Sequence, residues 1–233
     1  MRKWKLLFLI MPFGILISLF LFFPKVSAVT EELPLFGRVI FVDAGHGGRD
    51  SGASYGKLLE KDINLEISKV LEETLISKGA IVFMTREEDE DLSSKWDERK
   101  KRGDLYRRLL MYKKYHAELY LSIHLNSGET GGKGAEVLYH PINPKNKELG
   151  TILMKHFKND LKTTRVLKKT DLYMYRNTTV PGVLIECGFL SNANERYLLQ
   201  KVNYQKQIAD SITNAVIEFF DTVNTNESEE KTN

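Results

Sequence analysis

Two histidines and two glutamates stand at positions where they could form a hydrolytic metal site. His46 follows one short apolar run, His124 ends a second, and Glu186 follows a third. Glu60 lies just before a segment with helical periodicity. Hydrolytic zinc sites use three protein ligands, often two histidines and one glutamate, and a further carboxylate can act as general base toward water. The four side chains therefore supply the groups that metal-assisted hydrolysis requires.

Each of these signals is weak alone. A single histidine after a strand is more often a structural residue than a ligand. A glutamate directly after an apolar strand is less common, because a buried carboxylate must find a partner. Three glycines, Gly45, Gly47 and Gly48, allow the chain beside His46 to turn sharply and allow a metal and a substrate to approach.

Cys187 stands next to Glu186 and could be considered a nucleophile. Successive residues of a strand point to opposite faces, so these two side chains are not expected to share a site. We therefore predict that Cys187 is a small buried apolar residue. It is the only cysteine of the chain, which excludes an internal disulfide.

Segments with strand and helix patterns alternate along the chain. Strands are expected at 38–42, 80–85, 119–123, 135–139 and 183–185, and helices at 62–78, 106–115, 146–161 and 202–220. This order predicts an α/β single domain, with a twisted, mixed and mostly parallel sheet flanked by helices on both faces. Polar residues at the carboxyl ends of such strands meet at one edge of the sheet, which would bring the two histidines and Glu186 together.

Composition agrees with one globular domain. Hydrophobic residues make up 42% and charged residues 28% of the 233 residues. The net charge of +3 gives no reason to expect nucleic acid as a partner. We place the catalytic domain at 35–221 and expect 222–233, which is polar and acidic, to be a disordered tail.

The N-terminal segment 1–28 carries a targeting signal. Three basic residues precede the apolar run Leu6–Phe23, and Val26-Ser27-Ala28 resembles a cleavage site. The segment is interpreted as a signal peptide or as an N-terminal membrane anchor, since the run is just long enough to span a bilayer. In both cases it contacts the membrane, and the rest of the chain is exported to the outside of the cytoplasmic membrane.

Four motifs in order resemble the zinc-dependent N-acetylmuramoyl-L-alanine amidase family. They are VDAGHGG (42–48), LEKDINL (59–65), SIHLN (122–126) and IECGFLSN (185–192). The resemblance extends over roughly 38–220. The short one-domain form behind a membrane-targeting segment is most similar to the germination-specific members from spore-forming bacteria.

The resemblance implies a role for each residue. His46, Glu60 and His124 would bind Zn2+, and Glu186 would act as general base and then as proton donor to the leaving amine. The implied substrate is the amide between the lactyl group of muramic acid and L-alanine in peptidoglycan. For the germination-specific members, the implied setting is the spore cortex, before muramic δ-lactam is formed. Asn126 is placed either to bind substrate or to brace the His124 loop.

Two other functions use the same residues. A zinc peptidase of the wall would have the same ligands, and a peptidoglycan-binding protein could be non-catalytic or depend on a partner. The charge-dense segment 87–107 is ordinarily interpreted as solvated surface. A docking site for a protein activator or regulator is the more specific interpretation of this segment.

Overall fold

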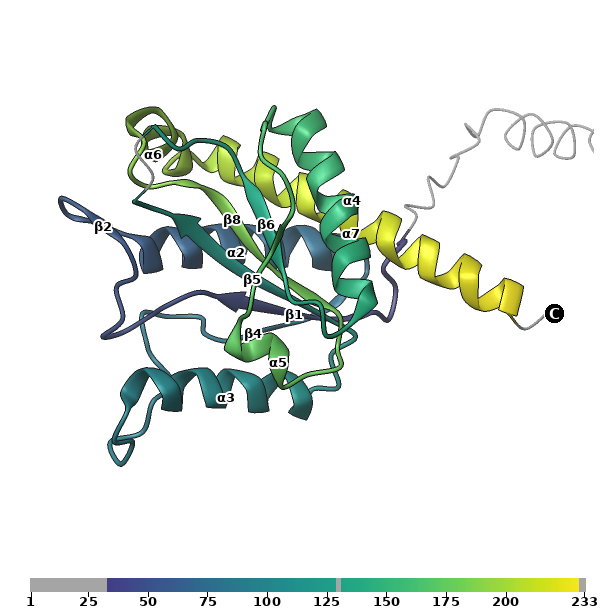
Figure 1. The fold of residues 1–233 in the computed structure, drawn as a ribbon, viewed down its shortest axis with the longest axis horizontal. Coiled ribbons are helices and arrows are strands. Elements are labelled where there is room, and N and C mark those ends of the chain that lie inside the picture. Colours follow the sequence, from purple (N-terminus) through teal and green to yellow (C-terminus); the bar gives the residue numbers. More distant parts are fainter. Residues whose placement is uncertain (1–32, 129–130, 231–233) are drawn as a thin grey trace, which may run out of the picture. The chain divides into compact units, whose positions relative to one another are not determined.

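The structure, a computed structural model, describes residues 33–128 and 131–230, with side chains described up to residue 225. Six strands form one sheet in the order β4-β1-β5-β8-β6-β7 (Figure 1). The strands are β1 Val39–Ala44, β4 Ile81–Met84, β5 Leu119–Asn126, β6 Glu136–Tyr139, β7 Lys168–Lys169 and β8 Gly182–Phe189. Only the β6–β8 pair is antiparallel within this sheet. The predicted mixed, mostly parallel sheet is thereby confirmed.

Helices cover both faces of the sheet, as predicted (Figure 1). The helices are α2 Glu60–Ser77, α3 Lys100–Lys114, α4 Pro144–Asp160, α5 Tyr173–Arg176, α6 Ala193–Leu199 and α7 Val202–Glu230. Residues of α2, α4 and α7 pack in one apolar cluster with the sheet, whereas α3 and α5 contribute to a second cluster on the other face. A hairpin of two short strands, β2 Ser54–Tyr55 and β3 Leu58–Leu59, precedes α2.

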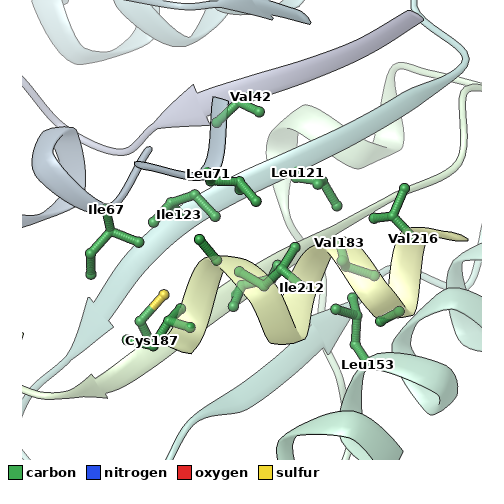
Figure 2. Packing of buried hydrophobic residues seen from close by; sticks show 14 of the residues in the cluster. Val42, Ile67, Leu71, Leu121, Ile123, Leu153, Val183, Cys187, Ile212 and Val216 are labelled. Carbon is green, nitrogen blue, oxygen red and sulfur yellow. The ribbon is translucent and has the colours of Figure 1, made fainter. Parts of the chain in front are cut away.

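The two faces of the central strands differ because side chains alternate along a strand. Val42, Leu121, Ile123, Val183 and Cys187 point toward α2 and α7, where Figure 2 shows them packed against helix side chains. All five are fully buried. This face is the main apolar core.

The other face of the same strands combines aromatic and polar side chains. Phe41 and Tyr120 pack with Tyr112 of α3 and Tyr175 of α5. Asp43, the next residue of β1 on this face, is buried as well. The sheet thus has one purely apolar face and one face that carries buried charge.

The candidate site residues occupy slightly different positions in their strands and helices from those predicted. The strands β5 and β8 stay paired through His124 and Glu186, so both residues lie within strands rather than after them. Glu60 is the first residue of α2, not a residue before it. Helix α3 begins at Lys100, six residues before the predicted start at 106.

The prediction that residues 222–233 form a disordered tail is wrong over most of that range. Helix α7 continues to Glu230, and only 231–233 lie outside the described residues. The hydroxyl groups of Thr222 and Thr225 donate to carbonyls one turn back, and Arg38 donates to the side chain of Asn224. Because Val223 also packs on the core, the helix gains tertiary contacts that a polar composition does not reveal.

None of the helices within the described ranges is long and apolar enough to cross a membrane. The targeting signal predicted at 1–28 lies outside the described residues.

Candidate metal centre

His46, Glu60 and His124 come together at the carboxyl edge of the sheet. One ligand atom from each lies within 4.8 Å of the others. Oε1 of Glu60 is 3.2 Å from Nε2 of His46 and 3.2 Å from Nδ1 of His124. The two imidazole rings meet edge to face at a centroid distance of 4.9 Å. The three residues that the sequence predicted as ligands therefore form one cluster that could hold a metal ion.

The loop after β1 brings His46 into this position. His46 adopts a left-handed backbone conformation with φ of +63°, which is uncommon for a residue other than glycine. A Cβ atom on Gly45 would lie 2.4 Å from the His124 ring, and one on Gly52 would lie 2.6 Å from Oε2 of Glu60. Glycine is required at both positions because the side chains of His124 and Glu60 occupy that space.

Glu60 is buried and ionised. Burial by itself would raise the pKa of Glu60, but hydrogen bonds and charge from His124 and His46 hold it well below its usual value. The backbone N–H of Ala53 donates to Oε2 at 2.8 Å, and that of Leu125 donates to Oε1 at 3.1 Å. The carboxylate is therefore fixed in place and negatively charged, as a metal ligand must be.

Asp50 was not among the predicted site residues, yet it orients His46. Its Oδ2 lies 3.1 Å from Nδ1 of His46, the ring nitrogen that does not face Glu60. A carboxylate on the second nitrogen of a ligating histidine fixes the tautomer and the ring orientation. Its place four residues after His46, in a glycine-rich loop, gave no recognisable motif.

Glu186 lies on the same face of the sheet, where it pairs in register with His124 of β5 and Glu136 of β6. Burial raises the pKa of Glu186 to about 7, opposed by the charges of His124 and His46 and assisted by those of Glu60 and Glu136. Its Oε2 is buried and has no hydrogen-bond partner among the described residues. Such a carboxylate can exchange a proton near neutral pH.

Asn126 ends β5 beside this group. Its amide Nδ2 donates to Oε1 of Glu136 at 2.7 Å, and Lys168 pairs with the other oxygen of Glu136 at 2.8 Å. Its Oδ1 accepts from the backbone N–H of Ser127 at 2.8 Å. The side chain of Asn126 is thus tied to the strand end, while one of its two amide N–H groups keeps the capacity to donate elsewhere.

A cavity of about 180 Å³ adjoins the cluster on the α3 and α5 side of the sheet. His46 and His124 line it together with charged residues such as Lys101 and with apolar or aromatic residues that include Leu105, Tyr173 and Leu184. The cavity gives a bound molecule mainly apolar surface beside the polar cluster.

Cys187 is buried on the opposite face, in the apolar core. Burial also raises the pKa of its thiol, which disfavours the reactive thiolate. The prediction that Cys187 and Glu186 do not share a site is confirmed.

The stretch Gly52-Ala53-Ser54-Tyr55-Gly56 has the spacing of a serine-hydrolase nucleophile elbow. In the structure Ser54 lies in the exposed hairpin β2–β3 and not between a strand and a helix. It therefore lacks the geometry of an elbow nucleophile.

The segment 87–107 makes more contacts with the rest of the molecule than its charge density suggests. Asp89 accepts from the backbone N–H of Gly48 at 2.8 Å and pairs with Lys61 at 2.5 Å. Asp91 pairs with Arg49 at 2.9 Å. These carboxylates attach the segment to the loop of His46, so part of its charge is used within the molecule.

The chain matches the family model described as N-acetylmuramoyl-L-alanine amidase over residues 40–218. It is 40% identical over 230 residues to the germination-specific N-acetylmuramoyl-L-alanine amidase of Bacillus subtilis (strain 168), covering 94% of this chain and 97% of that relative.

Solved structures agree with this similarity. The CwlD amidase from Clostridioides difficile, solved in complex with the GerS lipoprotein, superposes with a TM-score of 0.76 at 34% identity, covering 80% of this chain and 100% of that one. An N-acetylmuramoyl-L-alanine amidase from Clostridium difficile 630 superposes with a TM-score of 0.71 at 29% identity, covering 79% and 97% of the two chains.

Proposed function

The chain belongs to the N-acetylmuramoyl-L-alanine amidase family, and we propose that it hydrolyses the amide between the lactyl group of muramic acid and L-alanine in peptidoglycan. The observation that carries this proposal is the convergence of His46, Glu60 and His124 within 4.8 Å, beside the buried carboxylate of Glu186. Family membership favours this amide over the peptide bonds that a wall peptidase would cleave.

We propose that the three converging residues hold zinc. Two imidazole nitrogens and one carboxylate oxygen are a ligand set of catalytic zinc sites, and the shared Oε1 of Glu60 between the two rings fits that set. When bound, zinc would polarise the amide carbonyl and lower the pKa of a water molecule toward neutrality. Asp50 would keep the Nε2 lone pair of His46 directed at the ion by holding the proton on Nδ1.

Glu186 is proposed as the general base. It would accept a proton from the attacking water and deliver it to the amide nitrogen as the carbon–nitrogen bond breaks. The products are the lactyl carboxylate of muramic acid and a stem peptide with a free L-alanine amino group. A base with a pKa of about 7 suits both steps, because it can be deprotonated first and protonated later at neutral pH.

Asn126 and the neighbouring cavity are proposed to position the substrate. The remaining N–H of the Asn126 amide can donate to a substrate carbonyl while Glu136 holds the side chain still. The apolar wall that Leu105, Tyr173 and Leu184 contribute can receive the uncharged parts of the substrate next to the scissile bond.

Two further parts of the proposal concern the setting. Similarity to the germination-specific amidase of Bacillus subtilis supports the spore cortex as the substrate layer. Peptidoglycan lies outside the cytoplasmic membrane, which agrees with export through the segment 1–28, either cleaved or retained as an anchor.

The segment 87–107 is proposed as a docking surface for a protein partner. The related CwlD amidase of Clostridioides difficile was solved in complex with a lipoprotein. In this chain Trp96 is 80% exposed and Tyr106 is 50% exposed, and large exposed aromatic side chains are typical of protein interfaces. Trp96→Ala is expected to weaken binding of such a partner without changing the activity of the isolated chain.

The function is tested by product analysis. Purified full-length protein is incubated with peptidoglycan fragments before and after treatment with a chelator, and again after zinc is restored. Mass spectrometry should show intact stem peptides with a free L-alanine amino end, and only in the samples that contain zinc. Shortened peptides would indicate a peptidase, and release that survives the chelator would contradict the zinc proposal.

A further inference from the structure

Two buried arginines, Arg86 and Arg108, converge on the backbone of the loop that carries His46. Both are almost fully buried, with 2% and 1% of their surface exposed. Each donates to the carbonyl oxygens of Ala44 and His46, so each of these two oxygens accepts from both guanidinium groups. Burying two like charges beside one loop is unfavourable unless their hydrogen bonds are well satisfied.

Arg86 uses its hydrogen bonds to join two ligand-bearing segments. Its Nε donates to the carbonyl of His46 at 2.8 Å and its Nη2 to that of Gly45 at 3.1 Å. The same Nη2 donates to the carbonyl of Lys61 at 2.7 Å, in the first turn of α2 directly after Glu60. One rigid guanidinium therefore fixes the loop of His46 relative to the residue next to Glu60.

Arg108 joins the same loop to the strand of the third ligand. Its Nη2 donates to the carbonyl of His46 at 2.6 Å, and its Nη1 pairs with Asp43 at 2.6 Å. Asp43 in turn accepts from the hydroxyl of Ser122 at 2.6 Å. Ser122 lies two residues before His124 on the same face of β5, so this chain of contacts connects both histidines.

From these contacts we propose that Arg86 and Arg108 are positioning residues of the metal site. Arg86 sets the separation between His46 and Glu60, and Arg108 sets the separation between His46 and His124. Among the described residues, the hydrogen bonds from both arginines to His46 go to its backbone carbonyl and not to its ring, so both act through the left-handed backbone there. The inference rests on the proposed zinc site and extends it to two residues outside the ligand set.

The test compares Arg86→Lys and Arg108→Lys with Arg107→Lys in the full-length protein. Lysine keeps the positive charge but offers a single ammonium group that cannot span three segments. Arg107 is the matched control, because it neighbours Arg108 on α3 and pairs with Asp97, away from the loop of His46. Zinc dissociation constants are measured by competition with a chelator, and the visible absorption of the cobalt(II)-substituted proteins reports the ligand geometry.

We expect both test variants to bind zinc roughly 10- to 100-fold more weakly and to change the cobalt(II) spectrum, since partners beyond the ligands have effects of this size. Arg107→Lys should change neither. If the test variants fail to fold, Thr85→Val provides a milder change. Oγ1 of Thr85 accepts from Nη1 of Arg108 at 3.5 Å and from the backbone N–H of Ala44 at 3.1 Å, so its loss removes one contact that holds Arg108 against the loop and should weaken zinc binding in the same direction.

Unchanged zinc affinity and spectrum in Arg86→Lys and Arg108→Lys, or in Thr85→Val if it replaces them, would overturn the inference. If the variants then differed from wild type only in a lower melting temperature of the metal-free protein, the arginines would stabilise the fold without positioning the metal ligands. Failure of the wild-type protein to bind zinc would overturn the proposed metal site as well, so the wild-type measurement separates the two results.

Discussion

The two faces of the central sheet are formed by the same strands but have different roles. On β1, β5 and β8, one set of alternate residues, including Leu121 and Val183, enters the apolar core beneath α2, α4 and α7 (Figure 2). The other set lies on the face of α3 and α5, where Asp43 and His124 line the cavity and Glu186 pairs in register with His124. The first face buries apolar surface, and the second face places charged groups beside a cavity.

The contacts that hold the two faces also differ in kind. On the apolar face, packing is non-directional, and many side chains of suitable volume could fill the same space. On the other face, each buried charge needs a particular partner, as Asp43 needs Arg108, which is 65 residues away. A substitution on the first face should therefore reduce stability, and one on the second should reduce metal binding or catalysis.

The largest effect is expected for His124→Ala. This change removes one of the three converging ligands, so zinc binding and amide hydrolysis should both fall to background. Zinc content and product release would be measured on the same preparation. His140→Ala is the control, because His140 pairs with Asp171 outside the cluster and should keep both properties. Activity that survived in His124→Ala would assign the chemistry to another site.

The neighbours Glu186 and Cys187 give the sharpest contrast between the faces. Glu186→Ala should keep zinc and lose at least about 100-fold in kcat, the range for loss of a general base. Cys187→Ala, one residue along the strand on the apolar face, should keep kcat and lose only stability. Comparable loss of kcat in the two variants would contradict the separation of the faces.

Leu121→Ala tests the apolar face alone. Leu121 is fully buried, and truncation should lower the free energy of unfolding by about 2–5 kcal/mol while the folded protein keeps its zinc affinity. Denaturant unfolding provides the measurement. Ile81→Ala on the edge strand β4, where the side chain is 48% exposed, should stay within about 0.5 kcal/mol of wild type.

The smallest effect is a shift in pH dependence. Glu186 must be deprotonated to act as a base, so activity should rise as pH increases through its pKa. The charge of Glu136 contributes to raising that pKa, and Glu136→Gln removes this charge while Lys168 remains. In the profile of kcat against pH, the rise on the acidic side (the acidic limb) should therefore move to lower pH. Glu87→Gln, at an exposed position, should leave the limb in place, and movement to higher pH in Glu136→Gln would contradict this role.

The sequence predicted much of the fold because periodicity reports burial. The short apolar run that ends at Val42 and the helical stripe that includes Ile67 and Leu71 both contribute core positions. The short elements β7 and α5 escaped prediction because two and four residues are too few to establish a period. The continuation of α7 beyond 221 was missed because its tertiary contacts, such as that of Arg38 with Asn224, join residues 186 positions apart.

The residues proposed as metal ligands could be predicted from the sequence, but the residues that hold those ligands in position could not. His46, Glu60 and His124 stand in motifs that could be recognised, and the structure brings them together. Asp50 contacts the ring of His46 from within the same glycine-rich loop. Arg86 and Arg108 donate to the backbone carbonyls of Lys61 and His46, which lie 25 and 62 residues away from them along the chain. Their roles depend on loop conformation and on the packing of α3, which no local pattern encodes.

The most direct test of the central claim is the position of zinc itself. Crystals of the protein grown with zinc would be measured at the zinc absorption edge, and an anomalous difference map would be calculated. We expect one strong peak among His46, Glu60 and His124, at the carboxyl edge of the sheet. No peak there, with zinc instead beside His140 and Asp171 or beside His156 and Glu218, would contradict the assignment of the chemistry to this edge of the sheet.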